Sequence, residues 1–262
     1  MVYLATVDDF PSLEDIKSVK NQVSAEEWNT RVNLAACYRL VDLYGMSDMT
    51  RTHISAKIQG EESFLLNPFG LMFNEITASS LIKVDIDGKI LSESAYKINP
   101  AGYTIHSAVH SAREDVNCVL HTHSEAGMAI SALECGFLSI SQHAMRLHNR
   151  VAYHDYEGLA FDLDERERLA KDLGNHRNMV LRNHGLLTAG RTIDEAFSLM
   201  FYMEKCARSQ LKAMATGAKL IIPSDETCEH AAKQFDDNVN VSIRDWPGHL
   251  RRLDMMDGSF RR

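Results

Sequence analysis

The sequence predicts an α/β protein with one β-sheet and helices on both of its faces. The chain has 262 residues, of which 45% are hydrophobic and 24% charged, so it can bury one substantial core. Short segments rich in β-branched residues are interspersed with longer segments whose hydrophobic residues recur at helical spacing. No internal repeat, low-complexity tract or linker divides the chain, and we therefore expect a single domain over residues 1–262.

The first part of the chain is predicted to contain one helix and three strands. Residues 1–23 are polar and lack periodicity, and we interpret them as an arm. Ser24 followed by Glu27 is a capping box that starts a helix over about 25–44, and Gly45 ends this helix. Turn residues then separate three short strand-like segments, at 53–58, 64–67 and 81–87.

The second part of the chain alternates helices with strands, and two of these strands end in histidine. The predicted elements are a helix over 100–112, a strand over 117–121, a helix between Ser124 and Gly136, a strand over 151–154, a charged helix over 164–173, a strand over 179–184 and a helix from Thr192 to about Thr216. Residues 218–262 follow as a C-terminal extension beyond the core at about 24–217.

The charge and the cysteine content exclude several classes of protein. The chain carries 36 acidic and 28 basic residues, a net charge of −8, and so lacks the broad positive field that attracts nucleic acid or anionic lipid. The N-terminus does not read as a signal peptide, and no stretch approaches 18 uninterrupted apolar residues, so we expect no membrane insertion and a cytoplasmic location. The five cysteines show no CxxC spacing and do not indicate disulfides or a zinc clip.

Three histidines form the clearest candidate site. His121 and His123 are two residues apart, so on an extended segment both imidazoles lie on one face and can share an ion. His184 ends another predicted strand and precedes Gly185, which allows the backbone to turn sharply. Three neutral imidazoles suit zinc, manganese, iron or cobalt and leave a position open for water or substrate. Taken alone, the two histidines at 121 and 123 are more simply explained as hydrogen-bonded polar residues of a strand.

Three longer runs of sequence carry a family resemblance. They are HSAVHSAREDVNCVLHTHSEAGMAISAL (106–133), LRNHGLLTAGRTIDEAF (181–197) and NPFGLMFNEITASSLIKVD (67–85). Together they resemble the class II aldolase/adducin family over about residues 24–217, and the adducin head branch more than the sugar-phosphate aldolases. The resemblance implies a three-layer α/β/α fold with a central mixed, largely antiparallel sheet. It also implies a homotetramer with active sites at the subunit borders.

The resemblance further implies a metal role for the three histidines. In the enzymes of the family the corresponding residues bind zinc, which makes His121, His123 and His184 ligands of a divalent metal, most simply Zn²⁺, with Mn²⁺, Fe²⁺ or Co²⁺ as alternatives. Such a metal acts as a Lewis acid that chelates a carbonyl group with a neighbouring hydroxyl or carboxylate. It stabilises the enediolate that forms when a carbon–carbon bond breaks.

Two departures separate this chain from the sugar-phosphate aldolases it resembles. Those enzymes carry an acid/base glutamate four residues before the position of His106, where this chain has Gly102. Their phosphate-binding pairs fall near Gly45–Ser47 and Phe69–Gly70, where Met46 and Phe69 have no side-chain hydrogen bond to donate. We therefore expect a small substrate without phosphate.

Two further histidine sites are candidates for catalysis. His106 and His110 are four residues apart on one predicted helix face, so His106 could act as a base or as a partner of a metal ligand. Two surface or packing histidines explain the same spacing. His143 lies near where the aldolases contribute a tyrosine to a neighbouring subunit's site, and it could move a proton there or make a structural interface contact.

Two functions of different classes follow. The first is a metal-dependent lyase that cleaves or decarboxylates a small non-phosphorylated hydroxy or keto acid through an enolate. Loss of the glutamate harms decarboxylation least, because that reaction needs no base to remove a hydroxyl proton first. The second is a non-enzymatic scaffold like the adducin heads, with a residual metal site. This chain lacks the long basic tail of the adducins.

Overall fold

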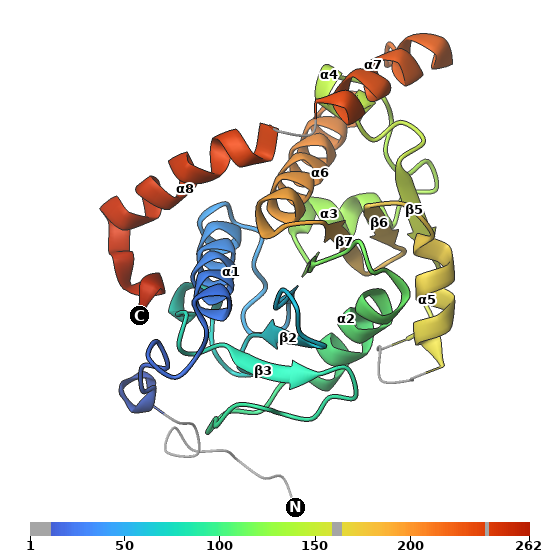
Figure 1. Ribbon diagram of the computed structural model, residues 1–262. Helices are drawn as coiled ribbons and strands as arrows, with labels where there is room; N and C mark the ends of the chain where they lie inside the picture. Colours follow the sequence, from blue (N-terminus) through green and yellow to red (C-terminus); the bar gives the residue numbers. More distant parts are fainter. Residues whose placement is uncertain (1–11, 159–163, 239–240) are drawn as a thin grey trace, which may run out of the picture.

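The central sheet has the predicted mixed character. The computed structural model describes residues 12–158, 164–238 and 241–262, and within them one sheet has the strand order β3-β2-β1-β4-β7-β6-β5 (Figure 1). The strands are β1 (His53–Lys57), β2 (Ser63–Leu66), β3 (Ile82–Asp85), β4 (Cys118–Thr122), β5 (Val151–His154), β6 (Asn178–Leu181) and β7 (Gly185–Gly190). Neighbouring strands are antiparallel except for the parallel pair β5 and β6. The sheet is therefore mixed and largely antiparallel, as expected.

Helices cover both faces of this sheet, which gives the predicted three layers (Figure 1). Helices α1 (Ala25–Leu43) and α6 (Ile193–Met214) share a hydrophobic core with one face of the strands, to which Leu120 and Leu186 belong. Helices α2 (Pro100–Ala112) and α5 (Glu165–Leu173) share a second core with the other face, to which Val119 and Leu187 belong. The alternation follows from the two-residue period of a strand.

The predicted helix starts agree with the capping residues of the structure. Ser24 accepts a hydrogen bond from the N–H of Glu27 at the start of α1, although the Glu27 carboxylate binds Arg31 and Lys83 and does not complete the predicted capping box. Thr192 accepts a hydrogen bond from the N–H of Glu195 at the start of α6. Ser124 caps α3 (Glu125–Ser131) in the same way through the N–H of Gly127. These side chains satisfy backbone donors that have no partner inside the helix.

One predicted strand is shorter than expected, and both ends of the chain contain elements that the sequence analysis did not predict. The strand predicted over 179–184 ends at Leu181, the chain turns at 182–184, and β7, which the prediction missed, returns beside it. The C-terminal extension forms two helices, α7 (Asp225–Asp237) and α8 (Val241–Asp257), of which α8 packs on α1 and α6. Within the expected N-terminal arm, residues 12–23 include a short 3-10 helix, η2 (Leu13–Asp15), and residues 1–11 lie outside the described residues.

The remaining short elements are η3 (Phe73–Glu75), α4 (Gln142–Met145) and η4 (Gly258–Arg261). Helix α4 packs against α6 and α7, and η4 packs against α1. Among the described residues, no helix is both long enough and apolar enough to cross a membrane.

Candidate metal centre

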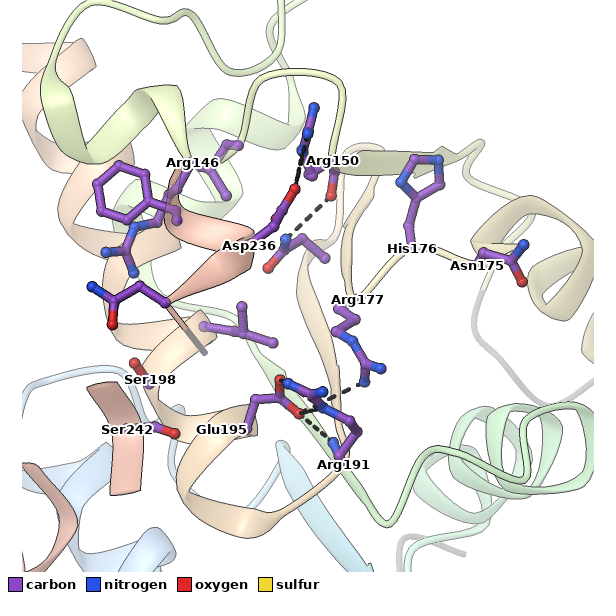
Figure 2. A pocket seen from close by; sticks show the side chains of 15 residues that line it. Arg146, Arg150, Asn175, His176, Arg177, Arg191, Glu195, Ser198, Asp236 and Ser242 are labelled. Atoms are coloured by element: carbon purple, nitrogen blue, oxygen red, sulfur yellow. Dashed lines mark hydrogen bonds and ion pairs between the residues drawn. The ribbon is translucent and has the colours of Figure 1, made fainter. Parts of the chain in front are cut away.

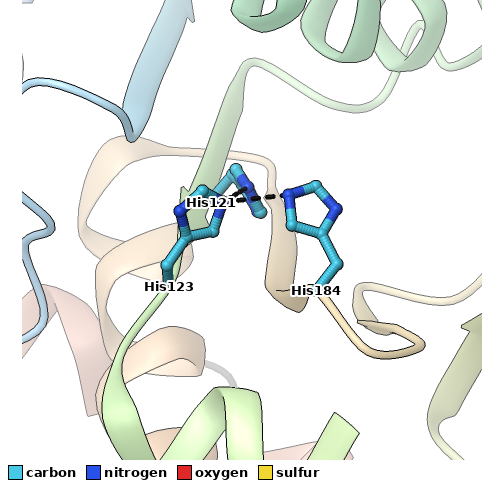
Figure 3. Close-up of side chains that lie close together, drawn as sticks. All are labelled: His121, His123 and His184. Carbon is cyan, nitrogen blue, oxygen red and sulfur yellow. Dashed lines mark hydrogen bonds between the residues drawn. The ribbon is translucent and has the colours of Figure 1, made fainter. Parts of the chain in front are cut away.

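Three histidines from two distant stretches meet at one end of the sheet (Figure 3). His121 is the fourth residue of β4 and pairs with Leu187 of β7. His123 follows the end of β4, and His184 is the last residue of the turn between β6 and β7. Because β4 and β7 are hydrogen-bonded neighbours, residues 61 positions apart in the sequence come together.

The ring nitrogens of these histidines converge within hydrogen-bond distance. Nε2 of His123 lies 2.8 Å from Nε2 of His121 and 2.9 Å from Nε2 of His184. The ring centroids are 4.6–4.8 Å apart. One donor atom from each ring lies within 4.8 Å of the others, as a shared ion requires.

The hydrogen bonds behind the rings show that a cation fits between them. Nδ1 of His121 donates to the carbonyl of Leu186 at 2.9 Å, and Nδ1 of His123 donates to the carboxylate of Asp48 at 3.0 Å. A neutral imidazole has one N–H, so the Nε2 atoms of His121 and His123 turn lone pairs toward each other. A shared divalent cation removes the resulting repulsion, and partners on Nδ1 are the usual support of metal-binding histidines.

Burial keeps the imidazoles in the form that a metal needs. Burial, together with the neighbouring histidines, lowers the pKa of His121 well below its usual value. The same causes lower the pKa of His184 to about 4. Both rings are therefore neutral near pH 7, and a metal held by three such rings would keep a coordination position for water or substrate.

Gly185 is needed for close packing and not for a sharp turn as expected. A Cβ atom at Gly185 would overlap the carbonyl oxygen of Thr122, the residue between His121 and His123. The left-handed conformation in this turn belongs to Asn183, whose φ is +55°. Gly185 thus lets β7 lie against β4 so closely that His184 reaches His121 and His123.

A line of hydrogen bonds that the sequence analysis missed lies beside the metal centre. Nδ1 of His53 is 2.7 Å from Nε2 of His106, Nδ1 of His106 bonds to the hydroxyl of Ser55, and that hydroxyl lies 2.7 Å from Nε2 of His110. All four residues are buried. His53 pairs directly with His121 across β1 and β4, and their ring centroids are 5.1 Å apart.

The spacing of these residues contained a usable signal. His53 and Ser55 are two apart on a strand and share the face on which His121 lies, while His106 and His110 are four apart on α2. Two polar pairs, each at the period of its element, indicate two faces that meet. The sequence analysis noted only the pair on the helix.

The two histidines predicted to be catalytic lie in different places. His106 is fully buried in the line of hydrogen bonds just described, and His53 lies between His106 and His121. His143 lies on α4 with its ring against Tyr202, at 4.9 Å between centroids. Burial and the nearby cations of Arg146 and Lys205 lower the pKa of His143. Within the described residues, no contact joins His143 to the three histidines of its own chain.

The site also explains why residue 102 is glycine. A Cβ atom at Gly102 would lie 2.6 Å from Cδ2 and 3.2 Å from Nε2 of His53. Any side chain at this position therefore needs the space that the His53 ring fills. The His53 ring therefore leaves no room at this position for the glutamate that the family resemblance leads us to compare it with.

A cavity of about 340 Å³ is lined by residues near the starts of β5 and β6 and the end of β7 (Figure 2). It is lined by four arginines, Arg146, Arg150, Arg177 and Arg191. Three of them are held by carboxylates: Arg150 binds Asp236 at 2.9 Å, and Arg177 and Arg191 share Glu195. Arg146 lies on the Tyr202 ring, 3.6 Å from its centroid. The cavity therefore has mainly structural ion pairs and lies apart from the metal centre.

Comparison with known proteins identifies the family. The model of the class II aldolase and adducin N-terminal domain matches residues 32–211. The chain belongs to this family. Among its class II aldolase and adducin relatives, the protein named "Putative aldolase class 2 protein" of Pseudomonas aeruginosa is 50% identical over 250 residues, which cover 93% of this chain and 96% of that one.

Adducins are also relatives within the class II aldolase and adducin family. The rat α-adducin is 42% identical over 190 residues, which cover 71% of this chain and 26% of the adducin. The chain therefore spans about a quarter of that protein's length.

Solved structures agree with the fold. The aldolase II superfamily protein from Pseudomonas syringae has a TM-score of 0.89 at 44% identity and covers 94% of this chain and 100% of that one. L-fuculose 1-phosphate aldolase from Glaciozyma antarctica has a TM-score of 0.81 at 25% identity, with 97% and 96% covered. The expected class II aldolase fold is confirmed.

Proposed function

We propose that this chain is a metal-dependent carbon–carbon lyase that acts on a small non-phosphorylated hydroxy or keto acid. The observation that carries the proposal is the set of three Nε2 atoms that converge while the Nδ1 atoms of two of the rings are already hydrogen-bonded. Zn²⁺ is the most fitting ion for three imidazoles, with Mn²⁺, Fe²⁺ or Co²⁺ as alternatives. Membership of the class II aldolase family supports this chemistry.

In this proposal the three histidines bind the metal and Asp48 orients one of them. His121, His123 and His184 hold the metal, which when bound stabilises negative charge on the oxygen of an enolate. Asp48 accepts the Nδ1–H of His123 and so fixes the direction of its Nε2 lone pair. Tyr156 lies at the edge of the site, 6.4 Å from His184 between ring centroids, and is half exposed.

The segments expected to bind phosphate in the aldolases have their donors engaged elsewhere. The N–H of Met46 donates to the carbonyl of Val41, and the hydroxyl of Ser47 donates to Asp42. The N–H of Phe69 donates to the carbonyl of Lys97. A phosphate at these positions would therefore find few free donors, which supports a substrate that binds through a carboxylate at the metal.

Decarboxylation is the reaction that this site favours over aldol cleavage. Aldol cleavage needs a base for the substrate hydroxyl, and Gly102 removes the carboxylate that the aldolases use. We propose that His53 faces the substrate there and that His106 acts through His53; because burial lowers the pKa of His53 to about 3, this ring is a weak base and does not replace the carboxylate in aldol cleavage. We further propose that His143 serves the site of a neighbouring subunit, because it makes no contact with the metal histidines of its own chain within the described residues.

A homotetramer would explain several exposed apolar side chains around the centre. Met49 follows Asp48 and is 68% exposed, and Met128 on α3 is 45% exposed. Such side chains are typical of subunit interfaces.

We also propose a cytoplasmic location, which the five free cysteines support.

A scaffold without catalysis is the alternative function. It is favoured by the 42% identity to the rat α-adducin over most of this chain. In that case the histidines keep a structural metal with no substrate bound. The two functions differ in whether a small acid binds to the metal and is converted.

A panel of small hydroxy and keto acids tests the proposal. Purified protein loaded with Zn²⁺ or Mn²⁺ should release carbon dioxide or an aldehyde from at least one acid, and a chelator should abolish the reaction. The His121→Ala/His123→Ala variant should be inactive, whereas His230→Ala, which removes an exposed histidine on α7, should leave the rate unchanged. Turnover that survives chelation would contradict a metal-dependent lyase, and absence of turnover across the panel would favour the scaffold.

A further inference from the structure

Four buried polar residues form a line behind the metal centre, and two of them, Ser55 and His110, have no role in the chemistry proposed so far. The line runs from His110 through Ser55 and His106 to His53, and three hydrogen bonds connect it. His106 and Ser55 are fully buried, His53 and His110 are 3% exposed, and the Phe64 ring lies against His110. Burying three imidazoles costs free energy unless each is hydrogen-bonded, so a purely structural role would be better served by apolar side chains.

The three imidazoles of this line are neutral. Burial lowers the pKa of His53 and of His110 to about 3, and it lowers that of His106 well below its usual value. Each ring therefore carries one N–H and one lone pair. Because each hydrogen bond needs one donor and one acceptor, fixing the hydrogen on one ring fixes it on all of them.

The surroundings of His110 determine the direction of the line, that is, which atom donates and which accepts in each of its hydrogen bonds. The backbone of Val116 raises the pKa of His110, as a carbonyl near the ring does, while Nε2 of this ring is occupied by Ser55 and its Nδ1 has no hydrogen-bond partner among the described residues. The hydrogen therefore belongs on Nδ1, because a lone pair there would face the carbonyl lone pairs. Nε2 of His110 then accepts from Ser55, whose oxygen accepts from Nδ1 of His106.

The position of the hydrogen on His106 determines its position on His53, the last residue of the line. With its hydrogen on Nδ1, His106 offers a lone pair on Nε2, which accepts from Nδ1 of His53. His53 is left with a bare Nε2, and in the described part of the chain this atom makes no hydrogen bond. The ring lies beside His121, one strand away from the metal centre.

We propose that Ser55, His106 and His110 are positioning residues that hold His53 with its hydrogen on Nδ1, so that its Nε2 accepts a hydrogen bond from a hydroxyl of the molecule at the metal centre. The inference rests on the proposed function only for the identity of that molecule as a hydroxy acid. The direction of the line depends on contacts of the chain alone. His53 thereby contacts the substrate, and the other three act through it.

Nitrogen NMR of the zinc-loaded protein, labelled with ¹⁵N in its histidines, tests the direction. A protonated ring nitrogen and a bare one have well separated shifts, so the spectrum reports where the hydrogen of each neutral ring lies. His53 should carry it on Nδ1, opposite to the Nε2–H form that dominates for free histidine. A wild-type spectrum with the hydrogen of His53 on Nε2 would overturn the proposal without any variant.

Two matched variants test the role of the line. Ser55→Ala removes its central hydroxyl, and Ser107→Ala removes an equally buried hydroxyl that donates to Thr104 outside the line. Ser55→Ala should move the hydrogen of His53 toward Nε2, and Ser107→Ala should not. If the hydrogen of His53 stays on Nδ1 in Ser55→Ala, the line does not position this ring and the proposal fails. If Ser55→Ala does not fold, the wild-type spectrum still decides.

Ligand binding supplies a readout that is independent of turnover. Glycolate has the hydroxyl that His53 would accept from, and acetate lacks it. The preference of zinc-loaded protein for glycolate over acetate should fall about two- to tenfold in Ser55→Ala relative to wild type, the size of one hydrogen bond. An unchanged preference would refute the contact with His53. A protein with the stated tautomer but no turnover would instead refute the lyase and leave this inference standing.

Discussion

Gly185→Ala tests whether the backbone packing of the sheet builds the metal centre. The new Cβ would overlap the carbonyl oxygen of Thr122, which lies in the ladder between β4 and β7. Thr122 and Gly185 are both buried in paired strands, so neither backbone can move without breaking that ladder. The substitution should therefore separate β7 from β4 at the point where His184 meets the other ligands.

The expected cost can be estimated from similar overpacking. Extra methyl groups in well-packed cores cost about 1–3 kcal/mol, and a clash with backbone belongs at the upper end, at about 3 kcal/mol. In a chain of this size, that corresponds to a loss of about 6–12 °C in Tm. Displacement of His184 should also weaken Zn²⁺ binding by at least about tenfold, as loss of ligand support does elsewhere.

Urea denaturation of the metal-free protein and zinc titration measure the two effects separately. Gly248→Ala is the matched control, because its Cβ would meet only Arg251 at 3.7 Å on helix α8. Alanine should stabilise that helix by about 0.5–1 kcal/mol and leave zinc binding unchanged. If Gly185→Ala is as stable as wild type and binds zinc equally well, the close approach of β7 and β4 does not determine the centre.

Three further predictions concern the metal and the buried histidines. Asp48→Ala should weaken Zn²⁺ binding about 10- to 100-fold in a competition with a chelating dye, because His123 loses the acceptor of its Nδ1–H; an unchanged Kd would exclude Asp48 from the site. Zinc at a hundred times its Kd should stabilise the protein by about 2.7 kcal/mol, or about 5–10 °C in Tm, and EDTA should reverse the shift; equal melting curves with and without zinc would contradict a site that forms only on folding. In the metal-free protein, stability should be constant above pH 6.5 and fall as the pH drops below it, because His53, His110 and His184 have pKa values of about 3, 3 and 4 when folded against 6.5 when unfolded. Each contributes a slope of up to about 1.4 kcal/mol per pH unit in that window, so urea midpoints that do not change between pH 7 and 5 would refute the neutral buried rings.

Local patterns in the sequence were sufficient for most helices and for two of the three candidate metal ligands. Capping residues such as Ser24 and Thr192 mark helix starts because they satisfy backbone donors within three residues. His121 and His123 were found because two residues on a strand share a face regardless of the rest of the fold. The contribution of His184 depended on family resemblance, since spacing along the chain does not say which strands become neighbours.

The missed features depend on an unusual turn or on contacts between distant segments. Strand β7 was missed because an apolar run continues on both sides of the turn, and the turn itself uses Asn183 in a left-handed conformation where a glycine would be the usual signal. Asp48 lies in a loop without a pattern, and only the folded chain brings its carboxylate to His123. His53 became visible only through its pairing with His121 across β1 and β4.

The stoichiometry of bound zinc at equilibrium tests most directly that three histidines share one ion. The account predicts one tightly bound ion per chain in the wild-type protein and in His230→Ala, and none in His121→Ala/His123→Ala. A wild-type chain that binds no stoichiometric metal, or a double variant that retains it, would contradict the metal centre and the chemistry built on it.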